Sequence, residues 1–118
     1  MLKIYISQPY SGVACKQDAY ELARKAVRYF ISIGCLPFSP ILHTHSLDGA
    51  FPAETFYEQD LAFLEMMAAQ GVVKPMLVLL KGWKTSEGCK KEKALAERLG
   101  FEITDFEELG SYPWGVAQ

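Results

Sequence analysis

The sequence lacks a long apolar run, a strong excess of charge of either sign and a secretory leader. Its 118 residues carry 12 Lys and Arg against 14 Asp and Glu, a net charge of −2, so no basic surface for a nucleic-acid polymer is expected. The apolar run at residues 76–80 has the length of a strand, far below the roughly 20 residues of a membrane span. The first residues enter a strand pattern directly, without signal-peptide architecture. These absences favour a soluble globular protein that acts on neither membranes nor nucleic-acid polymers.

Cysteine and histidine are also scarce. Cys15, Cys35 and Cys89 are odd in number and far apart, which fits neither a disulfide framework nor a zinc motif, so we expect a reducing, cytoplasmic setting. His43 and His45 lie two residues apart, but a zinc site would need a third ligand from elsewhere in the chain. We therefore expect no metal and no cofactor, and we place the histidines beside a pocket instead.

The chain, residues 1–118, is expected to form one domain, because its length supports a single core. Short β-rich runs alternate with segments whose apolar residues recur at helical spacing. Strands are expected at residues 2–7, 35–41, 76–80 and 101–106, and helices at about 14–33, about 53–70 and within 82–100. Two stretches are expected to be irregular, the loop at 42–54 and the tail at about 107–118. The aromatic residues of that tail are expected to be exposed and are candidates for contact with a neighbouring subunit.

Alternating strands and helices predict an α/β domain, a three-layer Rossmann-like or flavodoxin-like fold with a parallel sheet of four to five strands. We expect the first and third strands to be adjacent, which creates a topological switch point. Ligands in such sheets bind outside the carboxyl ends of the strands at that point. Two loops are expected to meet there, SQPYSG at residues 7–12 and KGWKTSEG at residues 81–88.

Two carboxylates lie on the apolar faces of predicted helices. Glu92 lies three and seven residues before Leu95 and Leu99, so it points with them toward the core. Asp60 lies four residues before Leu64, within the apolar face of the middle helix. Burying an unpaired carboxylate is costly, which favours protonation, a partner or a chemical role. Two carboxyl groups whose surroundings separate their pKa values can supply an acid and a nucleophile together.

Either carboxylate alone has an ordinary explanation, a boundary residue that reaches solvent or caps a nearby donor. Their convergence on one predicted crevice favours a functional role. Gly88, one turn before Glu92, removes a side chain where a ligand would approach, although glycine is also common where a helix start frays.

Three short stretches and one spaced pattern carry a resemblance to a known family. The stretches are IYISQPYSG, YEQDLAFL and SEGCKKE. The pattern is G-W-x-x-S-x-G-x-x-x-E, formed here by Gly82, Trp83, Ser86, Gly88 and Glu92. Over about residues 3–100, the chain resembles the nucleoside 2-deoxyribosyltransferase-like family, and most of all a subgroup of short members with that pattern.

The resemblance implies roles for individual residues. Glu92 would be the nucleophile that attacks C1′ of a 2′-deoxynucleoside, Asp60 the acid that assists departure of the base, and Tyr5 the group that orients Glu92. Ser86 would lie at the sugar or 5′-phosphate end of the pocket. Together with the switch-point argument, the resemblance predicts a substrate pocket that also includes Ser7, Gln8, Pro9, Tyr10, His43 and Gly88.

The predicted function is cleavage or transfer of the N-glycosidic bond of a deoxynucleoside or its monophosphate, through a covalent glutamyl-deoxyribose intermediate. The alternative is a non-catalytic nucleoside- or nucleotide-binding module that keeps the loops of the pocket. The resemblance also implies a homodimer or a higher homo-oligomer. Two departures from the relatives stand out: Gln8 replaces a frequent glycine, and a second aspartate that is common after Asp60 is missing.

Overall fold

A four-stranded parallel sheet forms the centre of the fold in this computed structural model, which describes residues 1–69 and 71–116. The strands are β1 (Lys3–Ser7), β2 (Leu36–Phe38), β3 (Met76–Leu79) and β4 (Glu102–Asp105). Their order across the sheet is β2-β1-β3-β4, and every neighbouring pair is parallel. The predicted adjacency of the first and third strands is therefore confirmed, and the switch point lies between β1 and β3.

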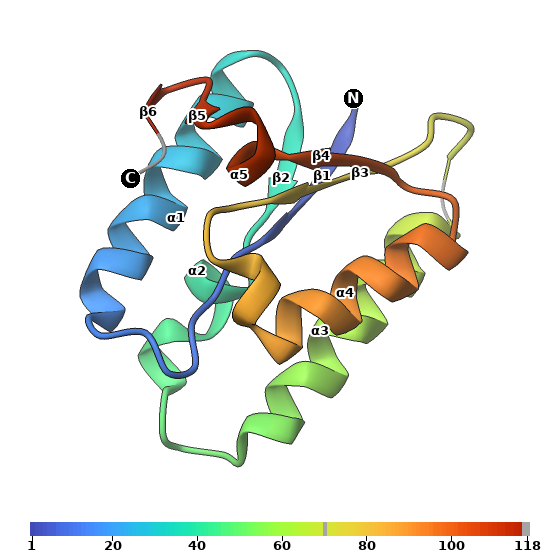
Figure 1. The fold of residues 1–118 in the computed structure, drawn as a ribbon. Helices are drawn as coiled ribbons and strands as arrows, with labels where there is room; N and C mark the ends of the chain where they lie inside the picture. The colour runs from blue at the N-terminus through green and yellow to red at the C-terminus, as the bar shows by residue number, and fades with distance from the viewer. Residues whose placement is uncertain (70, 117–118) are drawn as a thin grey trace.

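Helices cover both faces of this sheet, which gives the predicted three-layer Rossmann-like architecture (Figure 1). α1 (Lys16–Ser32) and the short α5 (Phe106–Leu109) cover one face, and α3 (Ala53–Ala68) and α4 (Glu87–Arg98) cover the other. The three predicted helices are confirmed, with ends that differ by a few residues. The last of them is preceded by a separate 3-10 turn, η2 (Trp83–Thr85).

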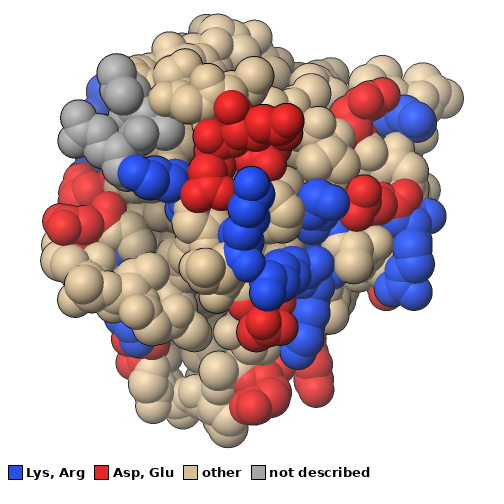
Figure 2. All heavy atoms as spheres, in the orientation of Figure 1, with Lys and Arg blue, Asp and Glu red and all other residues tan. Residues whose placement is uncertain are grey.

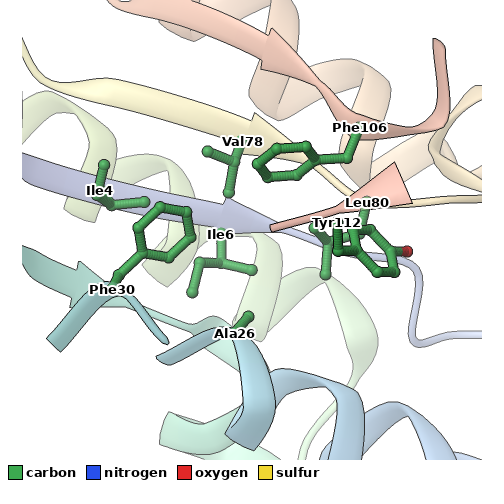
Figure 3. Close-up of a cluster of buried hydrophobic side chains, with 8 residues drawn as sticks. All are labelled: Ile4, Ile6, Ala26, Phe30, Val78, Leu80, Phe106 and Tyr112. Carbon is green, nitrogen blue, oxygen red and sulfur yellow. The ribbon is translucent and has the colours of Figure 1, made fainter. Parts of the chain in front are cut away.

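Strand β1 shows how the sequence builds the two faces of the sheet. Successive side chains of a strand point to opposite faces, and Ile4 and Ile6 pack with Phe30 of α1 in one buried cluster (Figure 3). Tyr5 lies in the cluster on the side of α3 and α4. Ser7 is two residues further along, so strand geometry turns it to the same side as Tyr5. Both hydroxyl-bearing side chains are thus directed toward α4.

The second strand is shorter than predicted. β2 ends at Phe38 because Ser39 is the N-cap of a short helix, α2 (Pro40–Thr44), in which the Ser39 hydroxyl accepts a hydrogen bond from the Leu42 amide. Proline suits the first position of a helix because the amide hydrogen it lacks would have no partner there. A 3-10 turn, η1 (His45–Leu47), follows α2, so the first part of the predicted loop is helical.

The prediction of an irregular tail was wrong for the described residues. After α5, β5 (Ser111–Tyr112) and β6 (Gly115–Val116) form an antiparallel hairpin. Tyr112 is buried and stacks on Trp114, with ring centroids 4.8 Å apart, and both rings lie edge-on to Phe106. Aromatic rings bury large apolar areas, so these side chains complete the core of their own chain. Residues 117 and 118 lie outside the described residues.

The surface carries charges of both signs. Figure 2 shows lysine and arginine side chains intermixed with acidic side chains on the face in view. Along α4, Lys90 pairs with Glu87 and Lys93 with Glu97 at helical spacing. Within the described part of the chain, no helix has the length and apolar character needed to cross a membrane.

Candidate active site

A cavity of about 240 Å³ lies at the carboxyl end of β1, the strand that forms the predicted switch point with β3. Its wall is formed by the loop after β1, by α2, by the first half of α3 and by the first turns of α4. The two loops predicted to meet are in contact, because a Cβ atom added at Gly82 would lie only 3.2 Å from Cγ of Pro9. Gly82 has a φ of +91°, a left-handed conformation that glycine adopts without strain.

Glu92 is buried at this cavity, with 7% of its surface exposed. The Ser7 hydroxyl donates a hydrogen bond of 2.8 Å to Oε1 of Glu92, and the Tyr5 hydroxyl donates to Oε2. The two donors come from alternate positions of β1, so they hold the carboxylate from the side of the sheet. The sequence-based expectation that Glu92 points inward is confirmed.

Burial raises the pKa of Glu92 from an ordinary 4.5 to about 8. The hydrogen bond from Tyr5 acts in the opposite direction, because it stabilises the charged carboxylate, and the bond from Ser7 does the same more weakly. The negative charge of Asp60 raises the pKa of Glu92 further. Asp60 therefore lies within electrostatic reach of Glu92.

Asp60 is the second carboxyl group of the cavity wall and extends from α3. Partial burial raises its pKa from 3.8 to about 7. Because the pKa values of Asp60 and Glu92 are both raised, the pair holds at least one proton at pH 7. The two hydroxyl groups that donate to Glu92 favour its charged form, but burial outweighs them, so a single shared proton rests mainly on Glu92. The form with the proton on Asp60 and the charge on Glu92 is the less populated one.

The start of α4 also contributes to the wall. The Ser86 hydroxyl is the N-cap acceptor for the Cys89 amide at 3.3 Å and so fixes the start of α4. Cys89 is buried beside Glu92, and burial followed by the carboxylate charge raises the pKa of its thiol to about 11. Cys89 is therefore a neutral thiol at physiological pH and a poor nucleophile.

The structure brings most of the predicted site residues to this cavity. Those that line it are Gln8, Tyr10, Asp60, Ser86, Gly88 and Glu92. Tyr5 and Ser7 lie behind Glu92 and act on the cavity through their hydrogen bonds to its carboxylate. Pro9 does not line the cavity because it packs against Gly82 in the neighbouring loop.

The prediction for His43 was wrong. Its side chain is exposed and lies outside the cavity, with its ring centroid 5.7 Å from that of Phe38 and 5.6 Å from that of Phe63. The chain enters α2 immediately after Ser39, so position 43 falls on a helix face that the loop reading did not anticipate. The other histidine, His45, lies nearer the site, where its Nδ1 is 2.7 Å from the Tyr10 hydroxyl.

Several cavity residues were missed in the sequence. Phe56 and Tyr57 line the cavity one turn before Asp60 on α3, so helical spacing alone contained the signal. Lys16 and Asp48 also line it and form an ion pair of 2.9 Å. No spacing rule could have found that pair, because it joins the start of α1 to a loop that is distant in the sequence.

Within residues 1–69 and 71–116, no group of three His, Cys, Asp or Glu side chains is arranged to hold a metal ion. The sequence matches a family described as a domain of unknown function, DUF1937, over residues 2–108. The chain belongs to the DUF1937 family. The DUF1937 match includes every cavity residue named above and ends before the β5–β6 hairpin. Comparison with curated proteins found no match.

Proposed function

We propose that this protein cleaves or transfers the N-glycosidic bond of a 2′-deoxynucleoside, or of its monophosphate, through a covalent intermediate on Glu92. The observation that carries the proposal is one buried carboxylate, fixed by two hydroxyl donors, in a cavity that holds a second carboxyl group of raised pKa. Retaining glycosidases use such a pair, one group as nucleophile and the other as acid and then base.

In the first step, a carboxylate oxygen of Glu92 attacks C1′ of the sugar while the C1′–N bond breaks. The electron pair of that bond goes to the base, and the proton of Asp60 passes to the base, so a neutral base leaves. The sugar carbon has oxocarbenium character in the transition state. A carboxylate removed from water stabilises that charge, and Tyr5 and Ser7 hold it in place.

In the second step, water or an acceptor base attacks C1′ and gives its proton to the Asp60 carboxylate. The bond between C1′ and Glu92 breaks, and its electron pair returns to the carboxylate. Water yields 2-deoxyribose, whereas a second base yields a new nucleoside. Two displacements at one carbon restore its original configuration, so the transferred sugar keeps its stereochemistry.

The charges of the cavity favour an uncharged substrate. The charged side chains among the described lining residues are Lys16, Asp48, Asp60 and Glu92. The ammonium group of Lys16 is paired with Asp48, so the remaining charges of the cavity are acidic. An added phosphate would be repelled by the carboxylates, and we expect the deoxynucleoside to react faster than its 5′-monophosphate.

The test is incubation of the protein with a panel of deoxynucleosides and their 5′-monophosphates, with and without an acceptor base, followed by chromatography. Free base without an acceptor identifies a hydrolase, and base exchange identifies a transferase. Glu92→Gln should lower turnover by about 1,000-fold or more. The matched control is Glu58→Gln, an exposed glutamate of α3 outside the cavity, which should retain full activity.

Two results would decide against the proposal. Full activity in Glu92→Gln would remove Glu92 as the nucleophile. Saturable binding of deoxynucleosides without any turnover would favour the non-catalytic binding module.

A deoxynucleoside fluorinated at C2′ gives an independent check, because the fluorine slows breakdown of the intermediate. Intact-protein mass spectrometry should then show a sugar adduct, and peptide mapping should place it on Glu92.

A further inference from the structure

The ring of Tyr57 packs directly on the backbone of α4 at Gly88. A Cβ atom added to Gly88 would lie 2.8 Å from Cε1 of Tyr57 and 3.4 Å from its Cζ. The first distance is shorter than a normal contact between carbon atoms, so any side chain at this position must displace the ring or move a helix. Gly88 also lines the cavity, but the ring of Tyr57, and not a ligand, occupies the position that a side chain of residue 88 would take.

The same two helices carry the two carboxyl groups, one turn further along. Asp60 follows Tyr57 by three residues on α3, and Glu92 follows Gly88 by four residues on α4, so each pair shares a helix face. Both helices return the chain to the start of a parallel strand, and they pack side by side on one face of the sheet (Figure 1). The contact between Tyr57 and Gly88 therefore lies one turn before the facing carboxyl groups.

A second contact holds the ring in this place. The ammonium nitrogen of Lys91 lies 5.6 Å from the centre of the Tyr57 ring, within the range of a cation–π interaction. Lys91 follows Gly88 by three residues on α4, so the ring packs on the backbone at Gly88 and also contacts a cation of the same helix. Tyr57 of α3 therefore contacts α4 twice, at the backbone of Gly88 and at the ammonium group of Lys91.

We propose that the packing of Tyr57 on Gly88 is a positioning device that sets the separation between Asp60 and Glu92. Glycine lets α3 approach α4 closely, and the aromatic ring defines how close the approach is. The consequence for catalysis rests on the proposed function, whereas the effect on the two carboxyl groups does not. A side chain at Gly88 wedges the helices apart and carries Asp60 away from Glu92.

The test compares Gly88→Ala, Tyr57→Leu, the double variant and the control Tyr57→Phe, which keeps the ring. Carbon-detected NMR titration follows the carboxyl carbons of Asp60 and Glu92. Glu92 is faced by Tyr5 and Ser7 from β1, by Asp60 from α3 and by Cys89 from its own helix, and none of the substitutions changes these groups. A shift therefore reports a change of position or of water access.

In Gly88→Ala, the pKa values of Asp60 and Glu92 should both fall toward their ordinary values, because separation weakens the effect of Asp60 and admits water. In Gly88→Ala combined with Tyr57→Leu, the smaller side chain makes room for the new methyl group, and the pKa values should return toward those of the wild type. In Tyr57→Phe, which keeps the ring on Gly88, the pKa values of Asp60 and Glu92 should equal those of the wild type. With an active substrate, kcat should fall by about 100-fold in Gly88→Ala with a smaller change in KM.

Unchanged pKa values in a folded Gly88→Ala variant would overturn the proposal, since the ring would then have moved without moving the helices. A double variant as perturbed as Gly88→Ala would overturn it as well. If Gly88→Ala does not fold, Tyr57→Leu opens the same contact from the other side, and unchanged pKa values there would also refute the proposal. Absence of turnover in the wild type refutes the proposed function and leaves this titration fully interpretable.

Discussion

Replacing Glu92 by glutamine should stabilise the protein at alkaline pH and leave it nearly unchanged at acid pH. Glutamine has the shape of glutamate: its amide oxygen can accept one of the two hydrogen bonds from Tyr5 and Ser7, and its NH2 group can donate to the oxygen of the other hydroxyl. It carries no charge at any pH. The substitution therefore isolates the cost of ionising one carboxyl group inside the fold.

The direction of this change in stability with pH follows from the pKa of Glu92, which burial raises from 4.5 to about 8. Below pH 4.5 the group is protonated in both states, and the wild type keeps its full stability. As the pH rises toward 8, the unfolded chain releases the proton while the folded chain retains it, so stability falls. At about 1.4 kcal/mol for each pKa unit, the loss reaches up to about 5 kcal/mol above pH 8, and the glutamine variant avoids it.

The assay is thermal and urea unfolding at pH 4.5, 6.5 and 8.5, with Glu58→Gln as the exposed control. A gain of a few kcal/mol in a domain of this size corresponds to a rise of about 10–20 °C in Tm. We expect such a rise for Glu92→Gln at pH 8.5, a smaller one at pH 6.5 and little change at pH 4.5. The control should follow the wild type throughout.

A gain that is the same at all three pH values would refute the reasoning, because a change of packing does not titrate. A loss of stability at pH 8.5 would refute it more strongly. It would mean that the charged carboxylate is a stabilising partner for the Tyr5 and Ser7 hydroxyls, which is the ordinary structural explanation for an inward glutamate.

Three further predictions concern activity. The pH profile of kcat/KM should be bell-shaped with its maximum between about 7 and 8, because the productive state holds one proton between the pKa values of Asp60 and Glu92. Tyr5→Phe removes a donor that lowers the pKa of Glu92, which is the higher of the two pKa values, so the alkaline side of that profile should move to higher pH, and an unmoved profile would contradict the orienting role of Tyr5. Asp60→Asn cannot donate the acidic proton, so kcat should fall by about 100-fold for bases that are poor leaving groups and less for good ones; an equal loss for all bases would argue against Asp60 as the acid.

Local periodicity was sufficient to predict most of the fold. The apolar spacing of α1, α3 and α4 located these helices, because tertiary contacts reinforce the same face that the sequence marks. The direction of Glu92 followed from the same spacing. The alternation of strands and helices then placed β1 beside β3, since few connections satisfy the rules for a parallel sheet. The position of Asp60 and Glu92 at one cavity depended on both inferences.

Two structural predictions were wrong, the length of the second strand and the irregular tail, and each has its own physical reason. The segment after Phe38 was predicted to continue the strand because its flanking residues favour β structure. Ser39 followed by Pro40 is instead a local signal for the start of a helix, and it outweighs that β preference. In the tail, the signal was local only for α5, which Asp105 caps at its start and Gly110 ends. The stacking of Tyr112 on Trp114 depends on the core that α1 and α5 provide, and only the folded chain brings these together.

The contact between Gly88 and Tyr57 belongs to neither case. The sequence shows a glycine in the first turn of a helix and an aromatic residue on another helix, and nothing in their spacing relates them. The relation appears only when α3 and α4 lie side by side. A glycine can therefore be a sign of close helix packing as well as a sign of ligand access.

The central place of β1 has a consequence for the order in which the chain acquires its parts. β1 precedes both of its neighbours in the sequence, and its second neighbour, β3, comes after α1, β2 and α3. At a synthesis rate of roughly 5–20 residues per second, several seconds pass between the synthesis of β1 and the synthesis of β3, and β1 is unpaired on that side during this time. Glu92 is made later still, so Tyr5 and Ser7 remain without their acceptor until α4 docks. A chain that ends at residue 80 contains the three strands β2, β1 and β3 but lacks Glu92, the candidate nucleophile. The candidate active site is therefore completed only after most of the sheet has been synthesised.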